Sequence, residues 1–300
     1  MYRIGILGAR ASDAGETHLW QIFRAALQER GWNEGVNIRI EYRWVEDNAA
    51  RLPELAADVV RLKPDLIVTR GSFLTGAPKA ATSSIPIVFI GHADPVGTGH
   101  VASLARPGGN VTGTAVLQTE LGPKGLELLH AVVPAAGRVA VLWHPGTPSA
   151  VPGLKALEEP ARRLRLQLQP VAAGTAAELE TAFQTMTREG AQATLVFNTP
   201  PFLMARQRLA ELAITHRLPT MFQGRFFVEA GGLMSYYPNP EDYWRRTAVY
   251  VDKILKGAKP ADYPVEQAAK FELMINSRAA RAIAITIPHS VLQRADQVID

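Results

Sequence analysis

The chain has no cysteine, no long apolar run and no dense cluster of positive charge. Among its 300 residues, the absence of cysteine excludes disulfide bonds, thiolate nucleophiles and cysteine-ligated zinc. No stretch is long and apolar enough to cross a bilayer as a helix. The first residues lead straight into an apolar run, without the pattern of a signal peptide. We expect either a cytoplasmic protein or a mature form without its leader.

Basic residues are spread along the chain instead of forming a stripe. The formal net charge is only +4 at pH 7, and the densest basic group, at residues 162–165, is typical of a solvated helix face. We therefore expect no nucleic-acid partner. The composition, 47% hydrophobic and 20% charged, is that of a globular protein. A length of 300 residues predicts two domains.

Common catalytic and cofactor motifs are also missing. Residues 5–10 contain glycines after a predicted strand but lack the G-x-G-x-x-G spacing of a dinucleotide site. There is no Walker-type Gly-Lys-Ser/Thr loop and no G-x-S-x-G elbow. The seven histidines are dispersed, without the close pairing of a helical metal site. We expect no cofactor, no metal site and no enzymatic activity.

Short apolar runs alternate with helix-period segments along almost the whole chain. The apolar runs form two series, residues 4–7, 66–68 and 87–90, then residues 139–142, 194–197 and 220–222. This alternation predicts an α/β fold with parallel sheets. In such sheets ligands bind beyond the carboxyl ends of the strands, at a switch in strand order. Two series predict two sheets whose polar edges face a common cleft.

The end of the chain departs from this alternation. Residues 243–255 have the period of an amphipathic helix, and residues 271–275 form a lone strand. The simplest arrangement returns the helix to the first domain and the strand to the second. We therefore predict two doubly wound parallel-sheet lobes joined by a three-crossing hinge that can close over a ligand. The predicted lobes are residues 1–115 plus 236–262 (lobe 1) and residues 116–235 plus 263–300 (lobe 2).

Several segments resemble one family with this layout. They lie in the expected order at residues 51–56, 62–65, 85–89, 94–97, 104–113, 250–260 and 270–276. The chain resembles the ABC-transporter substrate-binding family related to tryptophan- and tyrosine-binding lipoproteins, which has the type I periplasmic-binding-protein fold. The resemblance implies a periplasmic or cell-envelope receptor that passes a small-molecule solute to an ABC permease in the membrane. We expect it to be a monomer.

In the first series the candidate ligand groups follow the strands directly. Ser72 and nearby backbone N–H groups can hold a carboxylate at a helix N-terminus, or Ser72 can simply cap that helix. Arg70 can pair with the same anion or lie in solvent, and Arg10 and Arg225 offer the same choice. Asp94 can accept from a ligand ammonium group or close its own turn.

In the second series Asn198 and Thr199 can bind a ligand or cap the predicted helix at residues 202–217. Aromatic side chains at strand ends suit a flat ligand, with core packing as the alternative role. The predicted ligand-binding residues are Ala9, Arg10, Arg70, Gly71, Ser72, Phe73, His92, Asp94, Gln118, Trp143, His144, Asn198, Thr199, Phe222, Arg225 and Tyr236.

These observations support two hypotheses from different classes. The first is an extracytoplasmic solute-binding protein of an ABC importer, which binds a small carboxylate-bearing solute, an amino acid or aromatic acid, in the interlobe cleft. The alternative is a cytoplasmic enzyme or small-molecule sensor on the same scaffold. An enzyme needs convergent acid–base groups, and only His92, Asp94, His144 and Glu229 lie near predicted strand ends.

Overall fold

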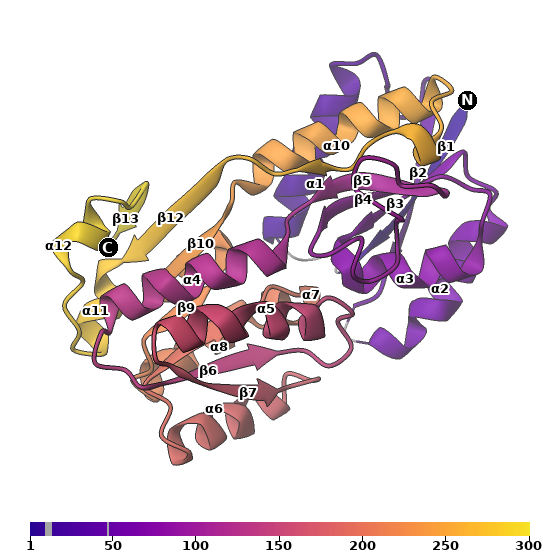
Figure 1. Ribbon diagram of the computed structural model, residues 1–300. Coiled ribbons are helices and arrows are strands. Elements are labelled where there is room, and N and C mark those ends of the chain that lie inside the picture. The colour runs from indigo at the N-terminus through magenta and orange to yellow at the C-terminus, as the bar shows by residue number, and fades with distance from the viewer. Residues whose placement is uncertain (10–13, 47) are drawn as a thin grey trace. The chain divides into compact units, whose positions relative to one another are not determined.

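The computed structural model describes residues 1–9, 14–46 and 48–300. The chain divides into two compact units, Met1–Leu117 with Asn239–Lys270 (the first unit) and Gln118–Pro238 with Phe271–Asp300 (the second unit). It therefore passes from one unit to the other three times, as the sequence predicts. Each unit is built on its own sheet, and Figure 1 labels most of their helices and strands.

The first unit alternates strands and helices from its first residues. Its strands are β1 (Tyr2–Gly8), β2 (Ile38–Trp44), β3 (Leu66–Arg70), β4 (Ile87–His92), β5 (Val111–Ala115) and β11 (Glu266–Gln267). Its helices are α1 (Ala14–Gln28), α2 (Leu52–Arg61), α3 (Gly71–Ala81) and α10 (Pro240–Leu255), with short 3-10 helices at Ala49–Arg51 and Pro260–Asp262. The apolar run of β1 forms a strand buried on both faces, because helices cover both sides of a parallel sheet.

The first sheet changes direction next to its first strand. Its order is β11-β5-β4-β3-β1-β2, and the described strand pairs are parallel. The chain moves from β1 to β2 on one side and then continues with β3 on the other. The switch in strand order therefore lies between β1 and β3, where ligands bind in folds of this type.

Helix α10 belongs to the first unit although it follows most of the second unit in sequence. It packs beside α1, and Figure 1 shows the two helices next to each other. The rings of Trp20 and Trp244 meet edge to face with centroids 4.7 Å apart. Arg245 also donates to Glu29 at 2.6 Å across the same pair of helices. Aromatic packing and an ion pair thus hold the returning helix.

The second unit repeats the pattern. Its strands are β6 (Arg138–Trp143), β7 (Gln167–Ala172), β8 (Ala193–Val196), β9 (Thr220–Phe222), β10 (Met234–Pro238), β12 (Phe271–Asn276) and β13 (Gln297–Ile299). Its helices are α4 (Gln118–Val132), α5 (Ala150–Arg163), α6 (Glu178–Arg188), α7 (Pro200–Met204), α8 (Arg206–Thr215), α9 (Arg225–Glu229), α11 (Ser277–Ala282) and α12 (His289–Leu292). Successive strand residues turn to opposite faces of the sheet. Val139 and Val141 join one buried cluster, while Ala140 and Leu142 join the other.

The second sheet has the order β13-β12-β10-β9-β8-β6-β7. Its switch lies between β6 and β8, the counterpart of the β1/β3 switch. Strand β12 is an exception to the predicted parallel arrangement, because it pairs antiparallel with β10. The chain reaches β12 from the first unit and not through a crossover helix of the second. The right-handed crossover that makes consecutive strands parallel is therefore absent before β12.

The unit boundaries fall at residues 117, 238 and 270, where the sequence placed them at 115, 235 and 262. The largest difference concerns residues 263–270, which the sequence assigned to lobe 2. Strand β11 pairs parallel with β5, and the N–H of Val265 donates to the carbonyl of Leu104. Backbone pairing thus makes this segment the last part of the first unit. Throughout residues 1–9, 14–46 and 48–300, every helix is too short or too polar to span a bilayer.

Candidate functional site

The carboxyl edge of the first sheet, where its strands end, places several predicted residues at the β1/β3 switch. Ala9 directly follows β1 and is buried, and its carbonyl accepts from the N–H of Glu46 at 2.7 Å. The backbone carbonyl of Ala9 is therefore already engaged within the first unit. Arg10 lies outside the described residues. On the other side of the switch, β3 ends at Arg70 and α3 begins at once with Gly71.

The start of α3 brings a cation and a helix N-terminus together. Arg70 occupies the N-cap position and is only 9% exposed, so it does not lie in solvent. Gly71 has a φ of +62°, a backbone conformation that a glycine adopts without steric cost. Ser72 is buried in the first turn and is not the N-cap residue, and Phe73 beside it is partly buried. The partial positive charge of this helix end and the Arg70 guanidinium both favour an anion here.

Tyr243 of α10 extends the same edge, although sequence reasoning did not select it. A Cβ on Gly91 would lie 2.9 Å from the Tyr243 ring, so glycine lets the ring approach β4 closely. Burial raises the pKa of the Tyr243 hydroxyl, and the positive charge of Arg70 partly offsets this rise. The phenol therefore stays neutral near the guanidinium and can donate a hydrogen bond.

His92, another predicted residue, is fully buried at the end of β4 and is engaged in the protein's own hydrogen bonds. The N–H of Asp94 donates to His92 Nδ1 at 3.1 Å, and His92 Nε2 lies 2.6 Å from His100 Nδ1. Because Nδ1 of His92 accepts, the neutral ring carries its proton on Nε2 and donates it to His100. Burial lowers the pKa of both rings, that of His100 to about 4.

Asp94 closes its own turn, which is the alternative role considered from the sequence. Its Oδ1 accepts from the N–H of Gly97 at 2.7 Å, and its carbonyl accepts from the Thr98 hydroxyl at 2.6 Å. A carboxylate held in this way shapes the loop after β4. The geometry gives Asp94 a structural role, and contact with a ligand ammonium group remains only a prediction.

The carboxyl edge of the second sheet carries a network of amide side chains. Gln118 is the first residue of α4, Asn198 follows β8, and Gln223 follows β9. Gln223 Oε1 accepts from Gln118 Nε2 at 3.2 Å and from the Asn198 N–H at 3.1 Å. The Asn198 side chain donates back to the Gln223 carbonyl at 2.5 Å. We call these three residues the amide network; two of them were predicted from the sequence.

His144 fixes the turn that follows β6. Its Nε2 donates to the Gly174 carbonyl at 3.1 Å, while Nδ1 accepts from the Gly146 N–H at 3.1 Å. Burial is the main cause of its lowered pKa, so the ring is neutral at pH 7. Both ring nitrogens are thus used within the second unit. The preceding Trp143 is partly buried and packs against the core.

Thr199 does not cap the following helix, contrary to one of the predicted roles. It is the N-cap residue of α7 but makes no side-chain cap. Its hydroxyl instead lies 2.8 Å from that of Thr147. Both side chains are buried, and the bond ties the loop after β6 to the loop after β8 across the switch.

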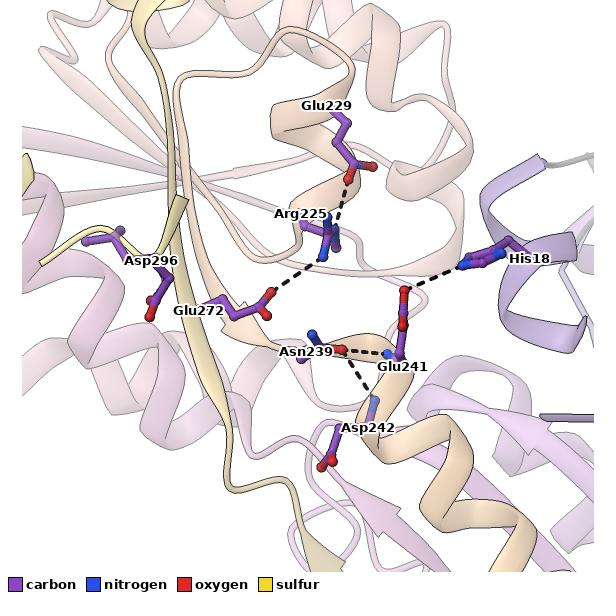
Figure 2. A network of polar contacts seen from close by, with 9 residues as sticks. His18, Arg225, Glu229, Asn239, Glu241, Asp242, Glu272 and Asp296 are labelled. Carbon is purple, nitrogen blue, oxygen red and sulfur yellow. Dashed lines mark hydrogen bonds and ion pairs between the residues drawn. The ribbon is translucent and has the colours of Figure 1, made fainter. Parts of the chain in front are cut away.

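Three other predicted residues of the second unit have clear structural contacts. Phe222 is fully buried and stacks on Phe227 with centroids 5.0 Å apart, which is the core-packing role that the sequence left open as the alternative to a ligand wall. As the last residue of a short strand, it turns toward the core. Tyr236 is partly buried and stacks on Phe271. Figure 2 shows Arg225 between Glu229 and Glu272, at 2.9 and 3.7 Å.

Sequence reasoning missed Gln223, Tyr243 and His100. Gln223 had a usable signal, because it directly follows an apolar run, as Asn198 does. Tyr243 lies inside a helix far along the chain, and His100 lies in a loop without periodicity, so neither spacing nor pattern marks them.

The described groups at each edge can bind a ligand through hydrogen bonds, and those of the first edge also through the Arg70 guanidinium. Within the described residues, no three histidine, aspartate or glutamate side chains form a group that could hold a metal ion. The polar groups at each edge are positioned by contacts within the same unit, such as the Thr147–Thr199 bond and the amide network. Groups held in this way can orient a small polar ligand without rearrangement.

Comparison with known proteins identifies the family. The family model described as ABC transporter substrate binding protein matches residues 12–299. The chain therefore belongs to this substrate-binding family, as the resemblance predicted.

Relatives and solved structures agree with this assignment. The chain is 25% identical over 263 residues to the tyrosine-binding protein of Clostridioides difficile strain R20291, covering 87% of this chain and 75% of the relative. A conserved domain protein from Vibrio cholerae matches with a TM-score of 0.92 and 27% identity over 99% of both chains. The domain from Streptococcus pneumoniae in complex with L-Trp matches with a TM-score of 0.90 and 25% identity, also over 99% of both. These neighbours confirm the predicted type I binding-protein fold.

Proposed function

We propose that this chain is the extracytoplasmic receptor of an ABC importer and that its solute is an aromatic amino acid or a closely related aromatic acid. The observation that carries the proposal is the position of the polar groups. In each unit, buried polar side chains gather where the strand order switches, which is where open α/β sheets bind ligands.

The relatives support the choice of solute. One is named a tyrosine-binding protein, and another structure holds L-Trp. Within this chain, Arg70 and the first turn of α3 favour a carboxylate group. The proposed partner is an ABC permease in the membrane, in accord with the family. A monomeric state remains our prediction.

Calorimetric titration of the purified chain tests the solute class. L-Tryptophan, L-tyrosine and L-phenylalanine should bind, whereas tryptamine, which has no carboxylate, should bind at least about tenfold more weakly. A ligand at 100 times its Kd should stabilise the folded chain by about 2.7 kcal/mol, visible as a higher Tm. The absence of both heat and stabilisation with every aromatic carboxylate would contradict the proposal.

Arg70→Met probes the proposed carboxylate contact, and Arg39→Met provides its control. Arg39 lies on edge strand β2, where its ion pair is with Glu41 and its side chain is largely exposed. Arg70→Met should weaken L-tryptophan binding at least about tenfold, because a hydrogen bond to a charged group is lost. Arg39→Met should leave the affinity unchanged.

A further inference from the structure

The side-chain amide of Gln223 is only partly hydrogen-bonded by the described residues. Its side chain is 2% exposed, and its Oε1 accepts the two hydrogen bonds from Gln118 and Asn198. In contrast, its Nε2 is buried and has no hydrogen-bond partner among the described residues. Buried polar atoms in folded proteins are nearly always paired, so an unpaired amide NH₂ requires an explanation.

The orientation of this amide is determined by the backbone. The Asn198 N–H can only donate, so the Gln223 atom 3.1 Å from it must be the carbonyl oxygen. Turning the amide over would place its NH₂ against this N–H, and both groups are donors. The NH₂ therefore points away from the Asn198 backbone, and the amide network holds it there. Gln118 and Asn198 act as positioning residues.

The turn after Gln223 is built to keep this arrangement. Gly224 has a φ of +151°, which an L side chain rarely adopts, and a Cβ there would lie 3.2 Å from Asn198 Nδ2. The backbone of residues 223–225 and the Asn198 amide thus depend on each other. The donor is held by a conformation that needs glycine, not by a mobile surface side chain.

We infer that Gln223 Nε2 donates a hydrogen bond to the carboxylate of the bound solute; this inference rests on the proposed function. A donor selects an acceptor, and in tryptophan both the ammonium group and the indole N–H are donors only. The carboxylate is the strong acceptor that all aromatic amino acids share. Nearby Arg225 is less suited to this contact, because Glu229 and Glu272 already face its guanidinium and would repel another carboxylate.

Gln223→Glu tests the contact, because it keeps the side-chain length and an acceptor oxygen but removes the NH₂. Its binding of L-tryptophan and of L-tryptophanamide, which carries no carboxylate, is measured at pH 8 by calorimetry. We expect the variant to bind L-tryptophan at least about 30-fold more weakly than the wild type. The affinity of the variant for L-tryptophanamide should differ from that of the wild type by less than about threefold, because the NH₂ of this compound can donate to the new carboxylate.

Gln192→Glu is the matched control. Gln192 Oε1 also accepts two backbone hydrogen bonds, from Gly137 at 2.7 Å and Arg138 at 3.2 Å, but at the amino end of β8. This variant should keep wild-type affinity for both compounds. Circular dichroism establishes that each variant folds. Should Gln223→Glu not fold, Gln223→Met replaces it and should weaken L-tryptophan binding roughly tenfold.

The outcomes separate this inference from the proposed function. If the wild type binds L-tryptophan and Gln223→Glu keeps the wild-type ratio of affinities for the two compounds, the Gln223 contact is overturned while the solute class stands. If the wild type binds no aromatic amino acid, the proposed function fails and the inference fails with it. A selective loss of L-tryptophan affinity supports both.

Discussion

Lowering the pH from 7 to 4.5 should destabilise the first unit through the His92–His100 pair. The two rings share a hydrogen bond of 2.6 Å, and the N–H of Asp94 occupies the other nitrogen of His92. Burial is the main cause that lowers the pKa of both rings, and the charge of Lys79 adds to the effect on His100. Protonation of His100 would also place a proton on the nitrogen that now accepts from His92.

The sign and size of the effect follow from the two states of His100. Its pKa is about 4 in the folded chain and 6.5 without the fold. The unfolded chain therefore takes up a proton first, so the stabilisation is complete above pH 6.5 and is lost as the pH falls toward 4. At about 1.36 kcal/mol per pKa unit the upper limit is roughly 3.4 kcal/mol, and solvent screening of the partly exposed ring reduces it to about 2 kcal/mol.

His100→Asn isolates this contribution, because the asparagine Oδ1 can accept from His92 in place of Nδ1 but does not titrate. Urea unfolding is followed by tryptophan fluorescence, since four of the five tryptophans belong to the first unit. Between pH 7 and pH 4.5 the free energy of unfolding of the wild type should fall by about 2 kcal/mol more than that of the variant. Equal losses, within about 0.5 kcal/mol, would refute the reasoning.

Three further variants test the packing of the fold by urea unfolding. Gly113→Ala should lower the free energy of unfolding by about 3 kcal/mol, because φ is +148° and a Cβ would overlap the Phe89 backbone. A decrease below about 1 kcal/mol would contradict this explanation. Asn239→Ala should lower the free energy of unfolding by about 1 kcal/mol. The Asn239 side chain caps α10 by accepting from the N–H groups of Glu241 and Asp242, as Figure 2 shows. An unchanged urea midpoint would contradict this role. Phe183→Ala should lower the free energy of unfolding by about 3–5 kcal/mol, because the ring is fully buried. Unfolding of this variant is followed by far-UV circular dichroism, and a decrease under about 2 kcal/mol would be inconsistent with the burial.

The element order and the three crossings were predictable because buried parallel strands have a simple signature. Strand β1 is a continuous apolar run, and α10 is an amphipathic helix left over with the lone strand β12 after the second alternating series. Strand β11 was missed because two residues carry no periodicity. The antiparallel direction of β12 was also missed, because side chains alternate in the same way in either direction.

The ends of the strands were more predictable than the side chains that gather beside them. Strand ends follow from hydrophobic patterning, so the sequence places Arg70 at the end of β3 and Asn198 just after β8, as in the structure. Which side chains face inward depends on the path of each loop. For this reason Phe222 was predicted at the site although it packs in the core, while Gln223 beside it was passed over.

Amide hydrogen exchange of the chain, followed by mass spectrometry with and without saturating L-tryptophan, tests the central claim most directly. Binding at the strand-order switches should slow exchange in residues 69–76, 143–150 and 197–226, and leave the amino ends of the strands unchanged. Unaltered exchange in all three segments, or protection confined to other parts of the chain, would contradict the account.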